Sequence, residues 1–285
     1  KQRKDQLRPN NIVVSERNTW EKELCPQLPK THTNNVGGEK SGLMKSSRLG
    51  AILDLVPDDC GVVDIGTDHA LLPIALARRG QQGVIIGSDC RSGPLEAARS
   101  NLIESGWIDR VELHLGFGLE VIKGRSDVET AVLAGMGGKN ILDILTRELP
   151  QAKSLRLLIL QPMRDGHHLR CWLADNGFGL IDEELVEEDG RVYEIIAVGR
   201  EGSNWDVGDL AEEVEAPGSW LVGLGPCLLR KRHPLLLPLL NSRKQEMMDV
   251  MADLQAKDSE RSRRRRQELS IQLGRLEKVM QWLSR

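Results

Sequence analysis

Apolar and polar residues alternate along positions 47–199 in a pattern that predicts short buried strands separated by amphipathic helices. Strands are expected at 61–65, 84–89, 111–115, 131–134 and 155–160, and helices at 47–56, 69–79, 93–105, 138–149 and 166–176. Strands that alternate with helices form a parallel sheet covered on both faces. Two further strands, at 178–186 and 192–199, predict a hairpin that adds an antiparallel strand to this α/β sheet.

The spacing of apolar residues changes after a polar, acidic connection at 200–218. Leu240, Met247 and Leu254 are seven residues apart, and a second stripe follows a polar stretch rich in arginine. The members of the second stripe are Leu269, Leu273, Leu276, Met280 and Leu283. Two heptad stripes predict two helices that fold back as an antiparallel coiled-coil hairpin or pack onto the body of the protein.

Composition divides the chain into three parts. Residues 1–43 are polar, lack periodicity and are expected to be disordered or an extension, 44–229 form the α/β domain, and 230–285 form the helical region. The five cysteines are scattered and include no C-x-x-C pair, which argues against a disulfide framework and a zinc ribbon, and we expect no metal. No apolar run reaches the roughly 20 residues that span a bilayer, so we expect a cytoplasmic protein without a membrane partner. The sequence does not give the oligomeric state, and a monomer is the favoured expectation.

The net charge of −3 hides an uneven distribution. Residues 230–285 hold 14 Lys and Arg against 7 Asp and Glu, so an acidic body carries a basic C-terminal region. This pattern indicates a polyanionic partner, and its simpler interpretation is a solvated helical face. The residues expected to contact such a partner are Arg261, Arg263, Arg264, Arg265 and Arg266.

The chain turns from a buried strand into a helix at Asp64-Ile65-Gly66-Thr67-Asp68-His69-Ala70, where a sheet of this class holds a nucleotide-like cofactor. The turn lacks the G-x-G-x-x-G pattern of pyrophosphate sites, because Asp68 stands at the second glycine position. A carboxylate repels phosphate but tolerates a sulfonium cation with an amino-acid head. The predicted cofactor is therefore S-adenosylmethionine, and the alternative is a turn in which Asp68 only caps the helix.

Three other strand ends carry residues suited to the same cofactor. Asp89 ends the second strand, 23 residues after Gly66, where an acid binds ribose hydroxyls or is simply a surface acid. Gly116-Phe117-Gly118 lets backbone approach a flat ligand, with Phe117 against an adenine ring or in the core. Ala134-Gly135-Met136-Gly137-Gly138 lines the substrate side or is a glycine-rich helix entry. The Asn/Asp-Pro-Pro-aromatic motif of many amine methylases is absent there, which argues against exocyclic amine chemistry.

Several of these motifs occur together in a fixed order. They are Ser47-Arg48-Leu49, the stretch Asp64 to Pro73, Ala134 to Gly138, Leu158-Ile159-Leu160-Gln161-Pro162 and Tyr193-Glu194-Ile195. From about Ser46 to the C-terminus, the chain resembles the bacterial tRNA adenine-22 N1-methyltransferase family. The resemblance implies a Rossmann-like class I methyltransferase sheet, S-adenosylmethionine as cofactor, tRNA as substrate and a C-terminal coiled coil that helps to hold tRNA. Family members usually have Asp or Asn where Phe117 stands, and we expect stacking there instead.

Residue roles follow from this chemistry. Adenine N1 already has a lone pair and its product is cationic, so a carboxylate near N1 and N6 would stabilise the charge that grows in the transition state. We assign this catalytic role to Asp68. The rival role for Asp68 is binding of the cofactor's amino group. The expected cofactor-binding residues are Asp64, Gly66, Thr67, Asp68, His69, Asp89, Gly116, Phe117, Gly118, Ala134, Gly135 and Met136, and Arg48 joins the RNA-binding arginines.

Two other classes of function stay open at this stage. One is a class I methyltransferase that acts on another RNA, a protein or a small molecule. The other is a non-catalytic RNA-binding adaptor, which would use the basic region and bind no cofactor.

Overall fold

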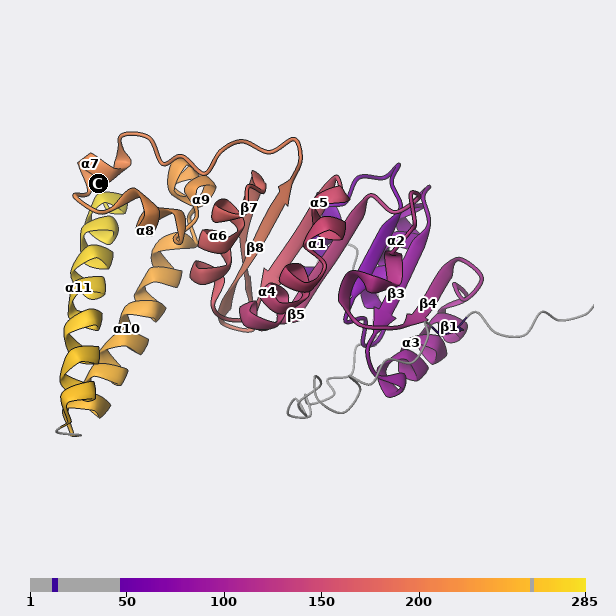
Figure 1. Cartoon of the computed structure of the whole chain (residues 1–285), viewed down its shortest axis with the longest axis horizontal. Helices are drawn as coiled ribbons and strands as arrows, with labels where there is room; N and C mark the ends of the chain where they lie inside the picture. The colour runs from indigo at the N-terminus through magenta and orange to yellow at the C-terminus, as the bar shows by residue number, and fades with distance from the viewer. Residues whose placement is uncertain (1–11, 15–46, 257–258) are drawn as a thin grey trace, which may run out of the picture.

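The computed structural model describes residues 12–14, 47–256 and 259–285. Its eight strands form one sheet in the order β1-β4-β3-β2-β5-β6-β8-β7 (Figure 1). Their bounds are β1 Ile12–Val14, β2 Val62–Ile65, β3 Ile85–Asp89, β4 Val111–Leu115, β5 Thr130–Met136, β6 Leu157–Pro162, β7 Gly179–Glu188 and β8 Arg191–Gly199. Strands β1 to β6 are parallel, and β8 runs antiparallel to both β6 and β7. The predicted mostly parallel sheet with an antiparallel hairpin is confirmed.

Strand β1 is not predicted by the sequence pattern. It pairs with β4 in the register Ile12 to Leu113, and so adds an edge to the sheet. The rest of the prediction for residues 1–43 lies outside the described residues.

Helices cover both faces of the sheet (Figure 1). Their bounds are α1 Arg48–Leu55, α2 Leu71–Arg79, α3 Ser92–Ser105, α4 Gly138–Arg147, α5 Leu149–Ser154, α6 Gly166–Asp175, α7 Leu210–Glu213, α8 Gly218–Val222, α9 Pro226–Lys231, α10 Leu236–Gln255 and α11 Glu260–Leu283, with a 3-10 turn at Gly118–Ile122. Ile52, Leu76 and Leu102 of α1 to α3 belong to the core on one face. Ile141 and Leu169, of α4 and α6, belong to the core on the other.

Local chemistry explains where several of these helices begin and end. The Ser47 hydroxyl accepts a hydrogen bond from the Gly50 N–H at 3.1 Å and caps α1, as the sequence predicts. The helix expected over 138–149 is present as α4 and ends at Arg147, and an additional helix, α5, begins at Leu149. Pro150 lacks the N–H that a continuous helix would need there. The polar connection contains the short helix α7 and is followed by α8 and α9, which the pattern does not predict.

The predicted helical hairpin is present as α10 and α11, which pack against each other and extend away from the sheet (Figure 1). Leu236, Leu240 and Leu276 at the base of the hairpin are buried with Leu185 of β7. Its base therefore packs onto the body, so both arrangements considered for this region occur together. The proposed division at residues 229 and 230 falls inside α9, which ends at Lys231, and stays a prediction.

A buried ion network ties the hairpin to the sheet. Arg170 of α6 is fully buried, and its Nε donates to the Glu183 carboxylate at 2.5 Å while Nη1 donates to Glu194. Arg243 of α10 also donates to Glu194, and the Cys227 N–H at the start of α9 donates to Glu183 at 2.9 Å. Although burial favours the neutral acid, Arg243 and Arg170 hold the pKa of Glu194 at about 2. Within the described residues, no helix has the length and apolar character needed to cross a membrane.

Candidate active site

The carboxyl end of β2 leads into the turn that the sequence singles out. Gly66 has φ +81°, a left-handed conformation that favours glycine, and the N–H groups of Gly66 and Thr67 both donate to the Ser88 carbonyl at 2.8 Å. The residue that caps α2 is Ala70, also left-handed at φ 53°, and it makes no side-chain cap. Asp68 therefore does not cap the helix, and the capping alternative is wrong.

Asp64 lies beneath this turn and is almost fully buried. Burial raises its pKa to about 6 from the ordinary 3.8, the Thr67 hydroxyl that donates to Oδ2 at 2.6 Å opposes this rise, and the negative charge of Asp89 adds to it. A carboxylate held in this way is stabilised by an incoming cation. The buried end of the turn thus favours a positively charged ligand group.

Asp89 ends β3 beside the same turn. Its Oδ1 accepts from the Arg91 N–H at 2.8 Å and from Arg91 Nε at 3.3 Å, and among the described residues no donor to Oδ2 is found. Burial raises the pKa of Asp89, Arg91 opposes the rise, and the charge of Asp68 adds to it. Asp89 is therefore close enough to both Asp64 and Asp68 for their charges to interact, which makes this edge of the sheet repulsive to phosphate.

Asp68 and His69 form the exposed part of the turn. Their side chains are 55% and 50% exposed, and His69 Nε2 lies 3.7 Å from Asp68 Oδ2. The His69 carbonyl accepts from Asn101 Nδ2 of α3 at 3.0 Å, which fixes the backbone. Both side chains are thus positioned by a rigid turn and remain open to a substrate.

Gly116, Phe117 and Gly118 follow the carboxyl end of β4. The Gly116 N–H donates to the Asp89 carbonyl at 3.1 Å, which places this loop beside the acid. Phe117 is half-buried, and the Arg147 guanidinium carbon lies 5.2 Å from the centre of its ring. Gly118 has φ +52°, and a Cβ there would lie 2.7 Å from Ile144. The glycine is needed for close packing, and adenine stacking on Phe117 stays a prediction.

The carboxyl end of β5 lies beside the turn at Gly66 and forms another side of the candidate site. The pairing of β5 with β6 shifts between Ala134 and Met136, and Gly135 between them is exposed with φ +74°. A Cβ at Gly66 would lie 3.1 Å from the Met136 Cε, so the two turns abut. The structure therefore brings the predicted residues of the β2, β3, β4 and β5 ends together at one edge of the sheet, where ligands of open α/β sheets bind.

The comparisons with known proteins agree with this geometry. A family model described as a methyltransferase domain matches residues 45–196, more than half of the chain. The chain belongs to this methyltransferase domain family. The resemblance that the motifs predict is thereby confirmed at the level of the fold and the enzyme class.

Individual relatives narrow the comparison. The tRNA (adenine(22)-N(1))-methyltransferase of Bacillus subtilis is 29% identical over 239 residues, which cover 84% of this chain and 98% of that protein. The crystal structure of the B. subtilis tRNA methyltransferase TrmK has a TM-score of 0.70 and 29% identity, and covers 82% of this chain and 98% of that one. A Streptococcus pneumoniae protein in complex with S-adenosyl-L-methionine has a TM-score of 0.66 and 27% identity, with 82% and 98% covered.

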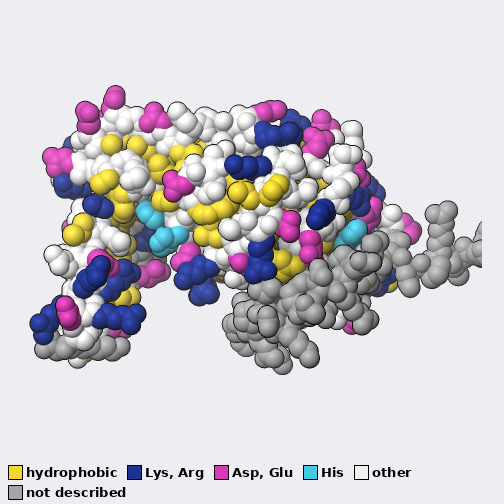
Figure 2. Space-filling model, in the orientation of Figure 1, with side chains coloured by type: hydrophobic (Ala, Val, Ile, Leu, Met, Phe, Trp, Pro, Cys, Tyr) yellow, Lys and Arg dark blue, Asp and Glu magenta, His cyan; other side chains and the backbone are white. Residues whose placement is uncertain are grey.

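The arginines expected to bind RNA do not lie together in this methyltransferase. Arg48 is at the start of α1, near the carboxyl edge of the sheet, whereas the other five lie in the first two turns of α11. Because α10 has 20 residues, it spans about 30 Å and holds these five far from the turn at Asp68. Figure 2 shows dark blue Lys and Arg side chains on the outer part of the hairpin.

Gln161 and Tyr193 lie at the site but are not among the residues predicted from the sequence to form it. Gln161 is fully buried at the end of β6, and its Oε1 accepts from the Gly135 N–H at 3.0 Å and from Arg48 Nη1 at 3.3 Å. Tyr193 of β8 lies under the Arg48 guanidinium, with 4.9 Å from the guanidinium carbon to the ring centre. Both occur in the motifs that carry the family resemblance, which was the available signal.

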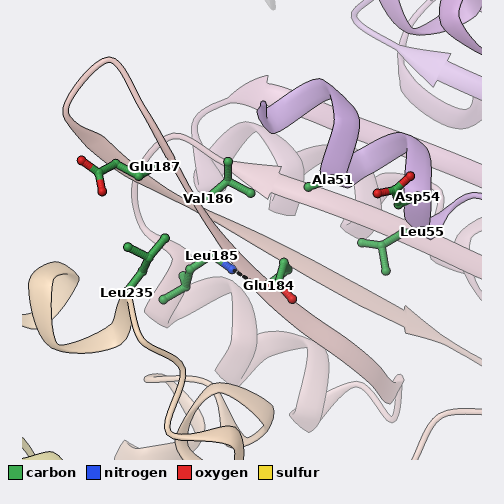
Figure 3. Close-up of a pocket in the computed structure, with 8 residues that line it drawn as sticks. All are labelled: Ala51, Asp54, Leu55, Glu184, Leu185, Val186, Glu187 and Leu235. Atoms are coloured by element: carbon green, nitrogen blue, oxygen red, sulfur yellow. Dashed lines mark hydrogen bonds between the residues drawn. The ribbon is translucent and has the colours of Figure 1, made fainter. Parts of the chain in front are cut away.

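A separate open groove of about 500 Å³ lies on the α1 face of β7 (Figure 3). Its lining is Ala51, Asp54, Leu55, Glu184, Leu185, Val186, Glu187 and Leu235. Three carboxylates among these residues repel phosphate, so the groove does not suit the backbone of RNA.

Proposed function

We propose that the protein transfers a methyl group from S-adenosylmethionine to N1 of an adenine in tRNA, with adenine 22 as the target. The observation that carries this proposal is the convergence of Asp64, Asp68 and Asp89 beside the Gly66 turn, in a chain similar over most of its length to an adenine-22 N1-methyltransferase.

The residues at the carboxyl edge fit S-adenosylmethionine. The buried carboxylate of Asp64 suits a cationic group, Oδ2 of Asp89 suits a ribose hydroxyl, and the left-handed Gly66 leaves space for backbone approach. When bound, the cofactor supplies an electrophilic methyl group on a sulfonium sulfur. Thr67 and Ser88 contribute by fixing the turn, since the hydroxyl of one holds Asp64 and the carbonyl of the other holds the turn's N–H groups.

Asp68 is proposed to act on the adenine. Its side chain caps no helix and is half-exposed beside the buried acids, so it can meet a base brought to this edge. A carboxylate near N1 and N6 stabilises the positive charge that the ring gains during methylation. Since the N1 edge takes part in base pairing, the target adenine must be unpaired or extruded, which costs a few kcal/mol.

The tip of the hairpin is proposed to hold tRNA at a distance from the chemistry. Five arginines crowd the positive end of the α11 dipole, where cations are disfavoured, so these charges reduce helix stability and are better explained by a polyanionic partner. Glu268 pairs with Arg264 at 3.5 Å and with Arg265 at 3.1 Å, and so compensates only part of the charge. Contacts to phosphate there would position tRNA and carry no sequence information. Action as a cytoplasmic monomer belongs to the same proposal.

The test is incubation with isotopically labelled S-adenosylmethionine and unmodified total tRNA, followed by nucleoside analysis. Label in 1-methyladenosine supports the proposal. Label in another nucleoside, or only in protein, would assign the site to a different substrate. If there is no methyl transfer and titration with S-adenosylmethionine releases no heat of binding, the RNA-binding adaptor is the remaining function.

A further inference from the structure

Arg48 is bound on several sides by the protein itself. Its Nη1 donates to Gln161 Oε1 at 3.3 Å and to Met163 Sδ at 3.4 Å, its Nε lies 3.7 Å from Glu188 Oε2, and its backbone N–H donates to Glu188 Oε1 at 3.3 Å. The guanidinium also lies over the ring of Tyr193. The charge of Arg48 is therefore compensated by Glu188. Its four neighbours also fix the orientation of the guanidinium plane. A side chain held in this way is a poor ligand for a mobile phosphate.

Gln161 connects this cluster to the active-site turn. Its Oε1 accepts from both Arg48 and the Gly135 N–H, and its Nε2 donates to the Pro162 carbonyl at 3.1 Å. Gly135 is exposed, and the next residue, Met136, abuts Gly66 of the cofactor turn. One buried amide thus sets the position of Arg48 relative to the turn that faces the cofactor.

The exposed parts of the cluster are flat or apolar. Arg48 is about a third exposed, Tyr193 is half-buried and Met163 is 43% exposed. Proteins that bind unpaired bases of RNA stack them on aromatic rings and on guanidinium planes. Because Glu188 compensates the charge of Arg48, the pair also avoids strong repulsion of a base that becomes cationic during methylation.

From these contacts we propose that Arg48 and Tyr193 form the stacking surface for the target adenine, and that Gln161 is the positioning residue that aligns this surface with the Gly135 turn. The proposal rests on the proposed function, in which the substrate is an adenine of tRNA. It changes the expected role of Arg48 from a general RNA contact to a contact with the reacting base.

The first test compares the purified full-length protein with Arg48→Lys, Tyr193→Leu and Tyr193→Phe. Loss of one base-stacking contact is expected to lower kcat/KM for tRNA roughly 10-fold to 100-fold in the first two variants. Tyr193→Phe keeps the ring and should retain wild-type activity within about twofold. Arg232→Lys is the matched control, because Arg232 stacks on Trp282 at 4.0 Å at the base of the hairpin. It should also retain kcat/KM.

Two further measurements separate a base contact from a structural role. The Kd of S-adenosylmethionine and the melting temperature should stay at wild-type values in Arg48→Lys and Tyr193→Leu. Wild-type protein should bind tRNA with an abasic target nucleotide more weakly than intact tRNA, whereas Arg48→Lys should bind the two alike. The double variant Arg48→Lys/Gln161→Leu should have the same kcat/KM for tRNA as the less active of the two single variants, because Arg48 and Gln161 act through the same contact.

The outcomes distinguish this proposal from the function on which it rests. If wild-type protein forms no 1-methyladenosine in tRNA, the proposed function fails. If it does, and Arg48→Lys and Tyr193→Leu keep wild-type kcat/KM, only the stacking surface is wrong. The stacking surface is also wrong if Arg48→Lys and wild-type protein lose the same tRNA affinity when intact tRNA is replaced by abasic tRNA.

Discussion

Asp64 gives the sharpest quantitative prediction, because its burial couples folding, pH and cofactor binding. Its pKa in the folded protein is about 6, against an ordinary value of 3.8, so the folded state binds its proton more tightly than the unfolded state. The proton on Asp64 therefore stabilises the folded state, and this stabilisation is fully present below pH 3.8. It is lost as the pH rises through about 6. Above that pH, the ionised carboxylate costs about 3 kcal/mol, from 1.36 kcal/mol for each pH unit.

Replacing Asp64 by Asn removes the charge and keeps an acceptor for the Thr67 hydroxyl. The unliganded variant should be more stable than wild type at pH 8 by up to about 3 kcal/mol, and by about half as much at pH 5. At about 2 °C for each kcal/mol in a chain of this size, the rise in melting temperature is several degrees. Differential scanning calorimetry at the two pH values measures it.

The same carboxylate should make cofactor binding depend on pH. A cationic cofactor needs Asp64 ionised, so the wild-type Kd for S-adenosylmethionine should rise about tenfold from pH 8 to pH 5. Asp64→Asn should bind more weakly at pH 8 and lose most of this dependence. A variant that melts below wild type at pH 8, or a wild-type Kd that is the same at both pH values, would refute the role assigned to the buried charge.

Three further predictions test other parts of the molecule. Asp68→Ala should abolish methyl transfer while the melting temperature stays within about 1 °C, because the half-exposed side chain caps no helix; normal turnover would remove Asp68 from the mechanism. Replacing Arg263, Arg264 and Arg265 together by Gln should raise the KM for tRNA at unchanged kcat and lower the salt dependence of tRNA binding. Arg200→Gln, at an exposed position outside the hairpin, is the control and should change neither. Unchanged tRNA affinity in the triple variant would contradict the proposed hairpin interface. Arg170→Met should lower the free energy of unfolding by about 3–5 kcal/mol in urea titration, because it removes the cationic partner of the buried Glu183 and leaves Glu194 with Arg243 alone. A loss below about 1 kcal/mol would contradict the network.

The structure also changes how the hairpin should be tested. Deletion of residues 235–285 is the obvious experiment, with tRNA binding expected to weaken more than cofactor binding. However, Leu236, Leu240 and Leu276 share a core with Leu185, and Arg243 partners Glu194, so deletion would expose the body and leave a buried charge. Substitution at the tip leaves these contacts intact and is the cleaner variant.

The fold and the cofactor turn could be predicted because their signals are local. Leu157–Leu160 is aliphatic throughout and Val62–Ile65 is aliphatic apart from Asp64, and both runs are buried. Gly66 with its neighbouring acids marks the end of one of these strands. Sequence order alone also placed Asp89 at a strand end, where the parallel sheet brings it to the same edge.

The parts that escaped prediction depend on residues far apart in the chain. Arg48, Gln161 and Tyr193 meet only because β6 and β8 are neighbours and α1 lies across them, and no pattern in any one segment indicates that contact. Likewise Arg170 and Glu183 look like exposed positions by residue type, yet each is fully buried against the other. A charged residue whose partner lies elsewhere in the sequence gives no local sign of burial.

The most direct test of the central assignment is position-resolved analysis of tRNA after incubation with S-adenosylmethionine and the full-length protein. Methylation at N1 blocks base pairing, so reverse transcription should stop at the target adenine, and nucleoside mass spectrometry should show 1-methyladenosine. We predict both signals with wild-type protein, and neither with Asp68→Ala nor with tRNA in which that adenine is replaced by guanine. Methylation that persists in the guanine-substituted tRNA, or that never appears on adenine, would contradict the assignment.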